Sequence, residues 1–219
     1  MAEMLKLDNI HKTFNPGTIN EKIALNGVNL TLNEGDFVTV IGGNGAGKST
    51  TLNAIAGVWP IDSGKIYIGG DDVTKLSEHK RAKYLGRVFQ DPMTGTATTM
   101  SIEENMAIAA RRGEKRGLSW GITHQERDTY REMLKTLDLG LEDRLTSKVG
   151  LLSGGQRQAL TLLMATLRKP DLLLLDEHTA ALDPKTADKV LQITEEIVAR
   201  DNLTTMMVTH NMKHAIQYG

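Results

Sequence analysis

Short apolar runs alternate with longer amphipathic stretches along most of this chain, a pattern typical of strands that alternate with helices. Near the start, strands are expected at residues 4–10 and 24–32, the second with a bulge or turn at Asn26-Gly27. Denser apolar runs predict buried strands at 37–41, 64–68, 85–89, 171–176 and 204–209. Helices are expected at 49–56, 77–84, 123–137, 152–168 and 184–200, and from Ser101 and Asn211 onward. This order predicts an α/β fold whose mostly parallel sheet is covered by helices on both faces.

Residues 42–50 join a strand-like run to a helical pattern and read Gly-Gly-Asn-Gly-Ala-Gly-Lys-Ser-Thr. Glycine, four residues, glycine, lysine and serine at a strand-to-helix turn is the phosphate-binding loop. Glycines let the backbone approach a phosphate, Lys48 adds positive charge, and the Ser49 hydroxyl is a ligand for magnesium. A glycine-rich turn that binds nothing is the alternative, but motif and context agree. The candidate nucleotide-binding residues here are Gly42, Asn44, Gly45, Ala46, Gly47, Lys48, Ser49 and Thr50.

Polar residues that follow other strands supply the partners of this loop. Asp176 ends the densest apolar run, where its carboxylate can reach a magnesium ion held by Ser49. Glu177 comes next and is the candidate general base for an attacking water. Two solvated carboxylates at a strand end are the alternative. Gln90 could contact the metal or water, and His210 the terminal phosphate, although each alone reads as an ordinary surface or structural residue.

A second helix N-terminus suited to phosphate binding is predicted at Ser153, Gly154, Gly155 and Gln156. One nucleotide does not need two such sites within one chain. A head-to-tail dimer, in which this start caps the nucleotide held by the other copy, is therefore expected.

About sixty residues of mainly helix and loop separate the strand at Leu85 from the strand at Leu172, which indicates an inserted helical subdomain. Within it, Arg111, Arg112, Lys115 and Arg116 lie among three glycines. A solvated loop is the simpler interpretation of this basic cluster, and a surface for an acidic partner is the alternative.

The composition excludes several classes of protein. With 40% hydrophobic and 24% charged residues, the 219-residue chain has an ordinary soluble balance and the length of about one to one-and-a-half domains. A net charge of −1 gives no electrostatic reason to expect nucleic acid as a partner. The lack of cysteine excludes disulfides and thiolate metal sites and fits a cytosolic chain. No apolar run approaches the ~20 residues of a membrane span, and the N-terminus does not read as a signal peptide.

The motifs and their order closely resemble the nucleotide-binding subunit of ATP-binding-cassette (ABC) transporters over essentially the whole chain. Residues 42–49 match the Walker A loop, Gln90 the Q-loop and 152–156 the signature, which separates this family from other P-loop enzymes. Residues 172–177 match Walker B with its catalytic glutamate, 181–183 the D-loop, and His210 the switch histidine.

The resemblance implies one ABC ATPase domain over 1–219, with a P-loop NTPase core, an antiparallel β subdomain and a helical subdomain. Core and β subdomain then span 1–90 and 153–219, and the helical subdomain 91–152. It implies ATP and Mg²⁺ bound in a homodimer, with Glu177, His210 and Gln90 catalytic. Ser49, Gln90 and Asp176 would hold the metal, while Asp183 and the signature residues would contact the nucleotide. Phe14 is the nearest match to the aromatic residue that stacks on adenine, where tyrosine is more usual.

The implied partners are transmembrane permease subunits, docked near Gln90 and the helical insertion, and a solute-binding protein. The implied place is the cytoplasmic side of the cell membrane, as a peripheral subunit. Residues 93–99 and 177–184 resemble an importer-type bacterial subgroup, often assigned to uptake of amino acids or similar small solutes. The alternatives are a non-transport ABC ATPase that acts as a conformational clamp and, disfavoured by the signature, a P-loop kinase of a small molecule.

Two features depart from the family pattern. His178 stands where proline commonly follows the catalytic glutamate, either as a tolerated loop substitution or as an extra titratable group beside Glu177. The chain stops at Gly219, soon after His210, where the family usually continues, so a truncated C-terminal end is expected and the stability of the dimer is left open.

Overall fold

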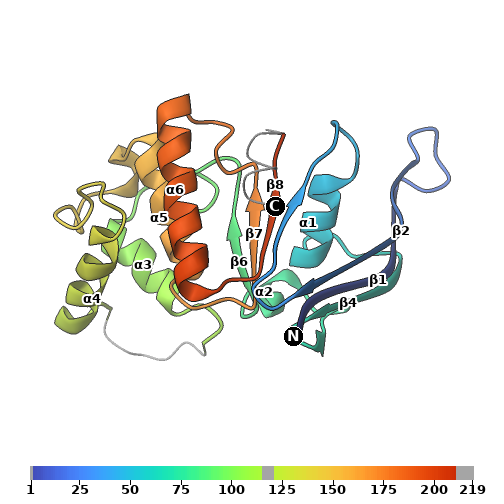
Figure 1. Ribbon diagram of the computed structural model, residues 1–219, viewed down its shortest axis with the longest axis horizontal. Coiled ribbons are helices and arrows are strands. Elements are labelled where there is room, and N and C mark those ends of the chain that lie inside the picture. The colour runs from blue at the N-terminus through green and yellow to red at the C-terminus, as the bar shows by residue number, and fades with distance from the viewer. Residues whose placement is uncertain (1, 115–120, 211–219) are drawn as a thin grey trace. The chain divides into compact units, whose positions relative to one another are not determined.

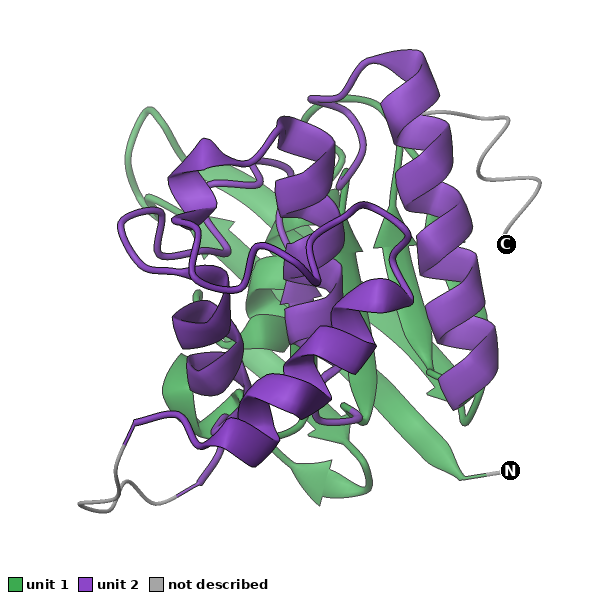
Figure 2. Cartoon of the chain, turned by 90° about the vertical axis from the view of Figure 1, so that its left-hand side faces the viewer, with its two compact units in different colours: residues 1–86, 170–177, 202–219 green, residues 87–169, 178–201 purple. Residues whose placement is uncertain are grey.

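The computed structural model describes residues 2–114 and 121–210, which form two compact units (Figures 1 and 2). Unit 1, green in Figure 2, comprises 1–86, 170–177 and 202–219, and unit 2, purple, comprises 87–169 and 178–201. The helix predicted from Asn211 onward, and the basic residues Lys115 and Arg116, lie outside the described residues.

An antiparallel sheet forms one part of unit 1, with β1 (Glu3–Phe14) between β2 (Lys22–Asn33) and β4 (Ser63–Ile68) (Figure 1). The short β5 (Asp71–Asp72) pairs with β4. Ile10 pairs with Val28 and His11 with Asn26, so Gly27 is the extra residue of a β-bulge. This confirms the predicted bulge. Both long strands exceed their predicted lengths because polar residues at their ends also pair, and Phe14 is consequently the last residue of β1 rather than a residue after it.

A parallel sheet forms the other part, in the order β3-β8-β7-β6. Its strands are β3 (Phe37–Val40), β8 (Thr205–Val208), β7 (Leu172–Asp176) and β6 (Leu85–Val88), the last of which leads the chain into unit 2. β8 pairs in parallel with both β3 and β7. The parallel sheet beside an antiparallel one confirms the predicted α/β class, and it brings the carboxyl ends of β3, β7 and β8 to one edge.

Helix α1 (Lys48–Ala56) packs its second half into the core of unit 1 and ends at Gly57, whose φ is 80°. Arg81, the last residue of the short helix α2 (Glu78–Arg81), is only 2% exposed. Its Nη1 donates to the carbonyls of Ala54 (2.7 Å) and Ile55 (2.8 Å) at the end of α1. Two further donations reach carbonyls of the loop before α2, so this buried cation is held by main-chain oxygens.

Unit 2 contains α3 (Ile102–Ala110), α4 (His124–Lys135), the 3₁₀ turn η1 (Val149–Leu151), α5 (Gly154–Thr166) and α6 (Pro184–Asp201). Helix α5 contacts α3, α4 and α6.

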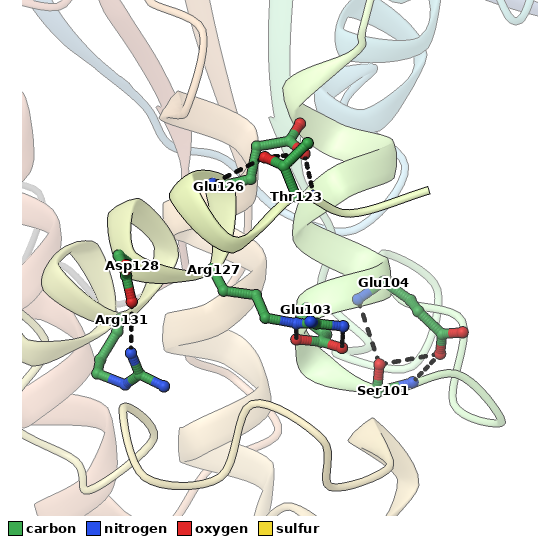
Figure 3. Close-up of polar contacts among 8 residues, drawn as sticks. All are labelled: Ser101, Glu103, Glu104, Thr123, Glu126, Arg127, Asp128 and Arg131. Atoms are coloured by element: carbon green, nitrogen blue, oxygen red, sulfur yellow. Dashed lines mark hydrogen bonds and ion pairs between the residues drawn. The ribbon is translucent and has the colours of Figure 1, made fainter. Parts of the chain in front are cut away.

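Capping boxes start α3 and α4, where Ser101 pairs with Glu104 and Thr123 with Glu126 (Figure 3). Arg127 joins the two helices through two hydrogen bonds, of 2.7 and 3.1 Å, to the buried carboxylate of Glu103. In the part of the chain that the structure describes, every helix is too short or too polar to cross a membrane.

Candidate functional site

A cavity of about 300 Å³ lies within unit 1 at the start of α1. Its walls come from the β3–α1 loop, the hairpin end of β1 and β2, and the residues that follow β7 and β8. The lining residues are Phe14, Lys22, Ala24, Asn44, Gly45, Ala46, Gly47, Lys48, Ser49, Thr50, Trp59, Glu177 and His210. Most residues predicted from the phosphate loop, Walker B and the switch position thus meet in one place.

The phosphate loop enters α1 through Gly47, which has a φ of 90° and offers no side chain to cap the helix. A Cβ at this position would lie 2.7 Å from the carbonyl oxygen of Ala24, so the site requires glycine for space as well as for conformation. Because no side chain occupies the first-turn amides of α1, they are left for an anion at the wall of the cavity.

Two lysines bring positive charge to this loop. Lys48 is only 8% exposed, and its Nζ donates to the carbonyls of Gly42 (2.8 Å) and Gly43 (3.0 Å). An ammonium group has three N–H donors, and these two bonds use two of them. Gly42 therefore acts as an acceptor for Lys48 and is not among the lining residues. Lys22, which sequence reasoning missed because it lies outside every motif, lines the same cavity.

Glu177 and His210 form a pair across the ends of β7 and β8. The amide of Glu177 donates to the carbonyl of Val208 (3.0 Å), and its Oε1 lies 2.7 Å from His210 Nε2. The Glu177 side chain is 13% exposed and that of His210 45%, so the carboxylate is shielded but reachable from the cavity. A carboxylate held in this way can orient a water molecule and accept its proton. Asp176 is half-buried at the end of β7, one residue before the pair.

An aromatic pair forms another wall of the cavity. Phe14 and Trp59 meet edge to face, with ring centroids 5.0 Å apart and planes at 83°. Apolar ring surface of this kind suits a planar base. Sequence reasoning found Phe14 but missed Trp59, for which the available signal was an aromatic residue just after the end of the phosphate-loop helix.

The remaining predicted residues, Gln90, Asp183 and the signature residues 153–156, belong to unit 2 and are not among those lining the cavity. Ser153 Oγ accepts from the amide of Gln156, and Gln156 Oε1 accepts from the amide of Ser153, both at 3.2 Å. Gly155 packs so closely that a Cβ there would lie 2.1 Å from Thr186 Cγ2. The start of α5 therefore has glycine amides beside its own capping box.

Asp183 caps α6, since its Oδ1 accepts from the amide of Thr186 at 3.1 Å. Hydrogen bonds from Thr186 hold the pKa of this carboxyl below its usual value.

Among the described residues, no group of three or more histidine, aspartate or glutamate side chains is arranged to hold a metal ion. A divalent ion here would need further ligands from a bound phosphate. Magnesium fits that requirement, because it prefers oxygen ligands and is usually bound by only one or two protein carboxylates, together with phosphate oxygens and water. The hydroxyl of Ser49 at the cavity wall and the carboxylate of Asp176 are donors of the right chemistry.

Known proteins match this chain over nearly all of its length. A family model described as ABC transporter matches residues 25–180. A tyrosine transport ATP-binding protein of Clostridioides difficile is 44% identical over 99% of this chain and 86% of its own length. The lipoprotein-releasing system ATP-binding protein LolD of a Ruegeria species is 34% identical over 98% and 92%. The dimeric, post-hydrolysis structure of the ATP-binding cassette MJ0796 with ADP and Pi has a TM-score of 0.80 and 32% identity, covering 97% of this chain and 90% of that one.

Proposed function

Because the chain belongs to the ABC transporter family, as an ATP-binding subunit that hydrolyses ATP, we propose that it drives uptake of an amino acid or similar small solute through separate permease subunits. It would bind MgATP in a head-to-tail homodimer at the cytoplasmic side of the membrane, and a solute-binding protein would deliver the solute. The cavity that joins Lys48, Glu177 and His210 is the observation that carries the proposed binding and hydrolysis of MgATP.

The phosphate end of the site follows from the loop. The open first-turn amides of α1 and the ammonium of Lys48 surround the space that phosphates would fill. Magnesium would supply positive charge to the phosphate oxygens, and Ser49, Asp176 and Gln90 are the residues that would hold it. Phe14 and Trp59 would bind the adenine base.

Hydrolysis would rest on Glu177. Its carboxylate would orient the attacking water and take up its proton, and the 2.7 Å contact with His210 would keep the carboxylate in place. His210, at the end of β8, would also donate to the terminal phosphate.

The dimer accounts for the second helix start. Ser153, Gly154, Gly155 and Gln156 line no part of the cavity in unit 1, yet glycine amides at a helix start suit a phosphate. In a head-to-tail pair, this start and Asp183 would cap the nucleotide held by the other copy. The dimeric state of the similar cassette supports this arrangement.

The solute class rests on the 44% identity with a tyrosine transport subunit, against 34% with a lipoprotein-release subunit. Uptake of labelled tyrosine, measured with the permease that co-purifies with this chain, tests it. Uptake that depends on an intact Lys48 is expected, and release of lipoprotein without amino-acid uptake would contradict the proposal.

Replacing Glu177 with glutamine tests the site itself. Glu177→Gln should lower the hydrolysis rate by about 100-fold or more while the protein still binds ATP, because only the proton acceptor is removed. The trapped nucleotide should then hold two chains together, as seen by light scattering with MgATP. Glu195→Gln, an exposed residue of α6, is the matched control. A Glu177→Gln protein that stays monomeric with ATP would argue against the sandwich.

A further inference from the structure

We infer that His178 is a positioning residue for Glu177, holding the backbone beyond the glutamate through a hydrogen bond to Thr194 in α6. The inference rests on the proposed role of Glu177 and assigns a function to the histidine that stands in place of the usual proline. His178 is 2% exposed, so it is not a surface loop substitution.

Glu177 needs such support because its backbone is unusual. Its φ is 46°, in the left-handed region that residues with a Cβ avoid. A conformation of this kind persists only where the surrounding structure holds it. Small rotations about this residue would move the carboxylate away from the position set by its 2.7 Å contact with His210.

Hydrogen bonds are present both at Glu177 and at the next residue. The amide of Glu177 itself donates to the carbonyl of Val208, which continues the pairing of β7 with β8. The next residue is His178, whose Nε2 lies 3.1 Å from Thr194 Oγ1. Glu177 and the residue that follows it are thus each held by a hydrogen bond, the first at the main-chain amide and the second at the side chain.

His178 is the donor in its hydrogen bond with Thr194. Thr194 Oγ1 donates its single hydrogen to the carbonyl of Val190, at 2.8 Å, so toward the imidazole it can only accept. His178 therefore carries a hydrogen on Nε2 and donates it. Both side chains are 2% exposed, and a hydrogen bond shielded from water in this way holds its geometry well.

A positioning role differs from a merely structural one in its kinetics. The loop around Lys48 binds the nucleotide whether or not the Glu177 carboxylate is well placed, so loss of the hydrogen bond from His178 should lower kcat and leave KM unchanged. A histidine that only fills space would change the melting temperature and leave kcat per folded molecule as it was.

The test uses four variants of the full chain with MgATP. His178→Ala and Thr194→Val should each lower kcat about 10- to 100-fold, as a misplaced catalytic group does, with KM within about twofold of wild type. His178→Gln keeps an N–H donor near the position of Nε2 and should recover most of the rate. Thr166→Val is the matched control, since Thr166 is a buried helical threonine of α5 that also donates to main-chain carbonyls.

Glu177→Gln, assayed beside these variants, distinguishes a failure of the proposed role of Glu177 from a failure of the positioning role of His178. If Glu177→Gln retains activity, the proposed role of Glu177 fails. If Glu177→Gln is inactive while Thr194→Val keeps wild-type kcat and His178→Ala lowers only the melting temperature, the positioning role is overturned. Should His178→Ala fail to fold, a reduced kcat in Thr194→Val with normal KM still supports it, and a normal kcat there overturns it.

Discussion

The two helices that begin at glycine-rich turns, α1 and α5, start in different ways. Helix α1 begins after Gly47 without any side-chain cap, whereas α5 begins with the capping box of Ser153 and Gln156. The first leaves its amides to a ligand, and the second satisfies part of its start from its own sequence. This difference is consistent with the proposed roles, in which the amides of α1 would bind the phosphates and the capped start of α5 would contact a nucleotide bound by another chain.

The opposite ends of the two helices are alike. Arg81 donates to the last carbonyls of α1, and Arg112 donates to the carbonyls of Ala165 (2.8 Å) and Arg168 (2.6 Å) at the end of α5. Burial lowers the pKa of both guanidinium groups, and a cation at a helix C-terminus also complements the helix dipole. The two helices therefore differ in the capping of their N-termini, where phosphate would bind, and are alike at their C-termini, where an arginine donates to main-chain carbonyls.

The largest expected effect concerns the start of α5. Ser153→Arg should lower ATP turnover by about 100-fold or more, because the large cation would block the position where a partner's phosphate is bound. ATP affinity of the isolated chain should hardly change, since Ser153 does not line the cavity. Thr146→Arg, which adds the same cation at an exposed position before η1, is the control. An equal loss of ATP binding in Ser153→Arg would show that this start does not act on a partner's nucleotide.

The next effect concerns the start of α1. Lys48→Ala should weaken ATP binding about 10- to 100-fold, the range for a lost hydrogen bond from a charged group, even in an isolated chain. Lys65→Ala removes an exposed lysine of β4 and should leave affinity unchanged. Titration with a fluorescent ATP analogue measures both variants, and unchanged binding in Lys48→Ala would place the phosphates elsewhere.

The two C-terminal arginines offer a comparison in stability. Arg81→Met should reduce the free energy of unfolding by about 3 kcal/mol, because two buried and two partly buried carbonyls lose a charged donor. Arg112→Met should cost about half as much, since Arg112 is less buried and its described donations reach two carbonyls. Urea unfolding measures both, and equal losses would contradict the ranking.

The smallest effect concerns charge in the capping boxes. Those of α3 and α4 use glutamate, and the hydrogen bond from the Thr123 amide holds the pKa of Glu126 below its usual value. Gln156→Glu should therefore add about 0.5 kcal/mol of stability at pH 7 through the helix dipole. Part of this gain is offset, because an ionised carboxylate cannot replace the hydrogen bond from Gln156 Nε2 to the carbonyl of Leu139 (3.2 Å).

In the Gln156→Glu variant, we expect the new carboxyl to have a lowered pKa, as Glu126 does in the corresponding position of α4. This sets the sign of the pH dependence. The gain should be fully present above the unfolded pKa of about 4.3 and disappear as the pH falls through the lower folded pKa. Thermal unfolding of both proteins at pH 7 and at pH 3 measures it. A gain that persists at pH 3 would contradict the electrostatic origin.

Much of the site could be predicted because its residues belong to motifs with fixed spacing. The phosphate loop, Glu177 and His210 were all predicted, and the parallel pairing of β8 with β3 and β7 brings them into one cavity. Lys22 and Trp59 were missed because their proximity depends on how the β1–β2 hairpin and the end of α1 fold, which no local pattern encodes.

Arg81 could not be predicted either. In sequence it is one basic residue of a short polar helix, a position that usually lies in solvent. Its burial follows from tertiary structure, because the carbonyls at the end of α1 need donors and the chain before α2 passes close to them. The helix was expected to extend to residue 84 but ends at this arginine.

Trp59 gives the protein a built-in optical reporter. The sequence has two tryptophans, Trp59 and Trp120, and Trp59 lies in the wall of the cavity against Phe14. In a Trp120→Phe background, all indole emission would come from the place where a nucleotide base is expected. Filling and emptying of the site could then be followed in real time without any attached dye.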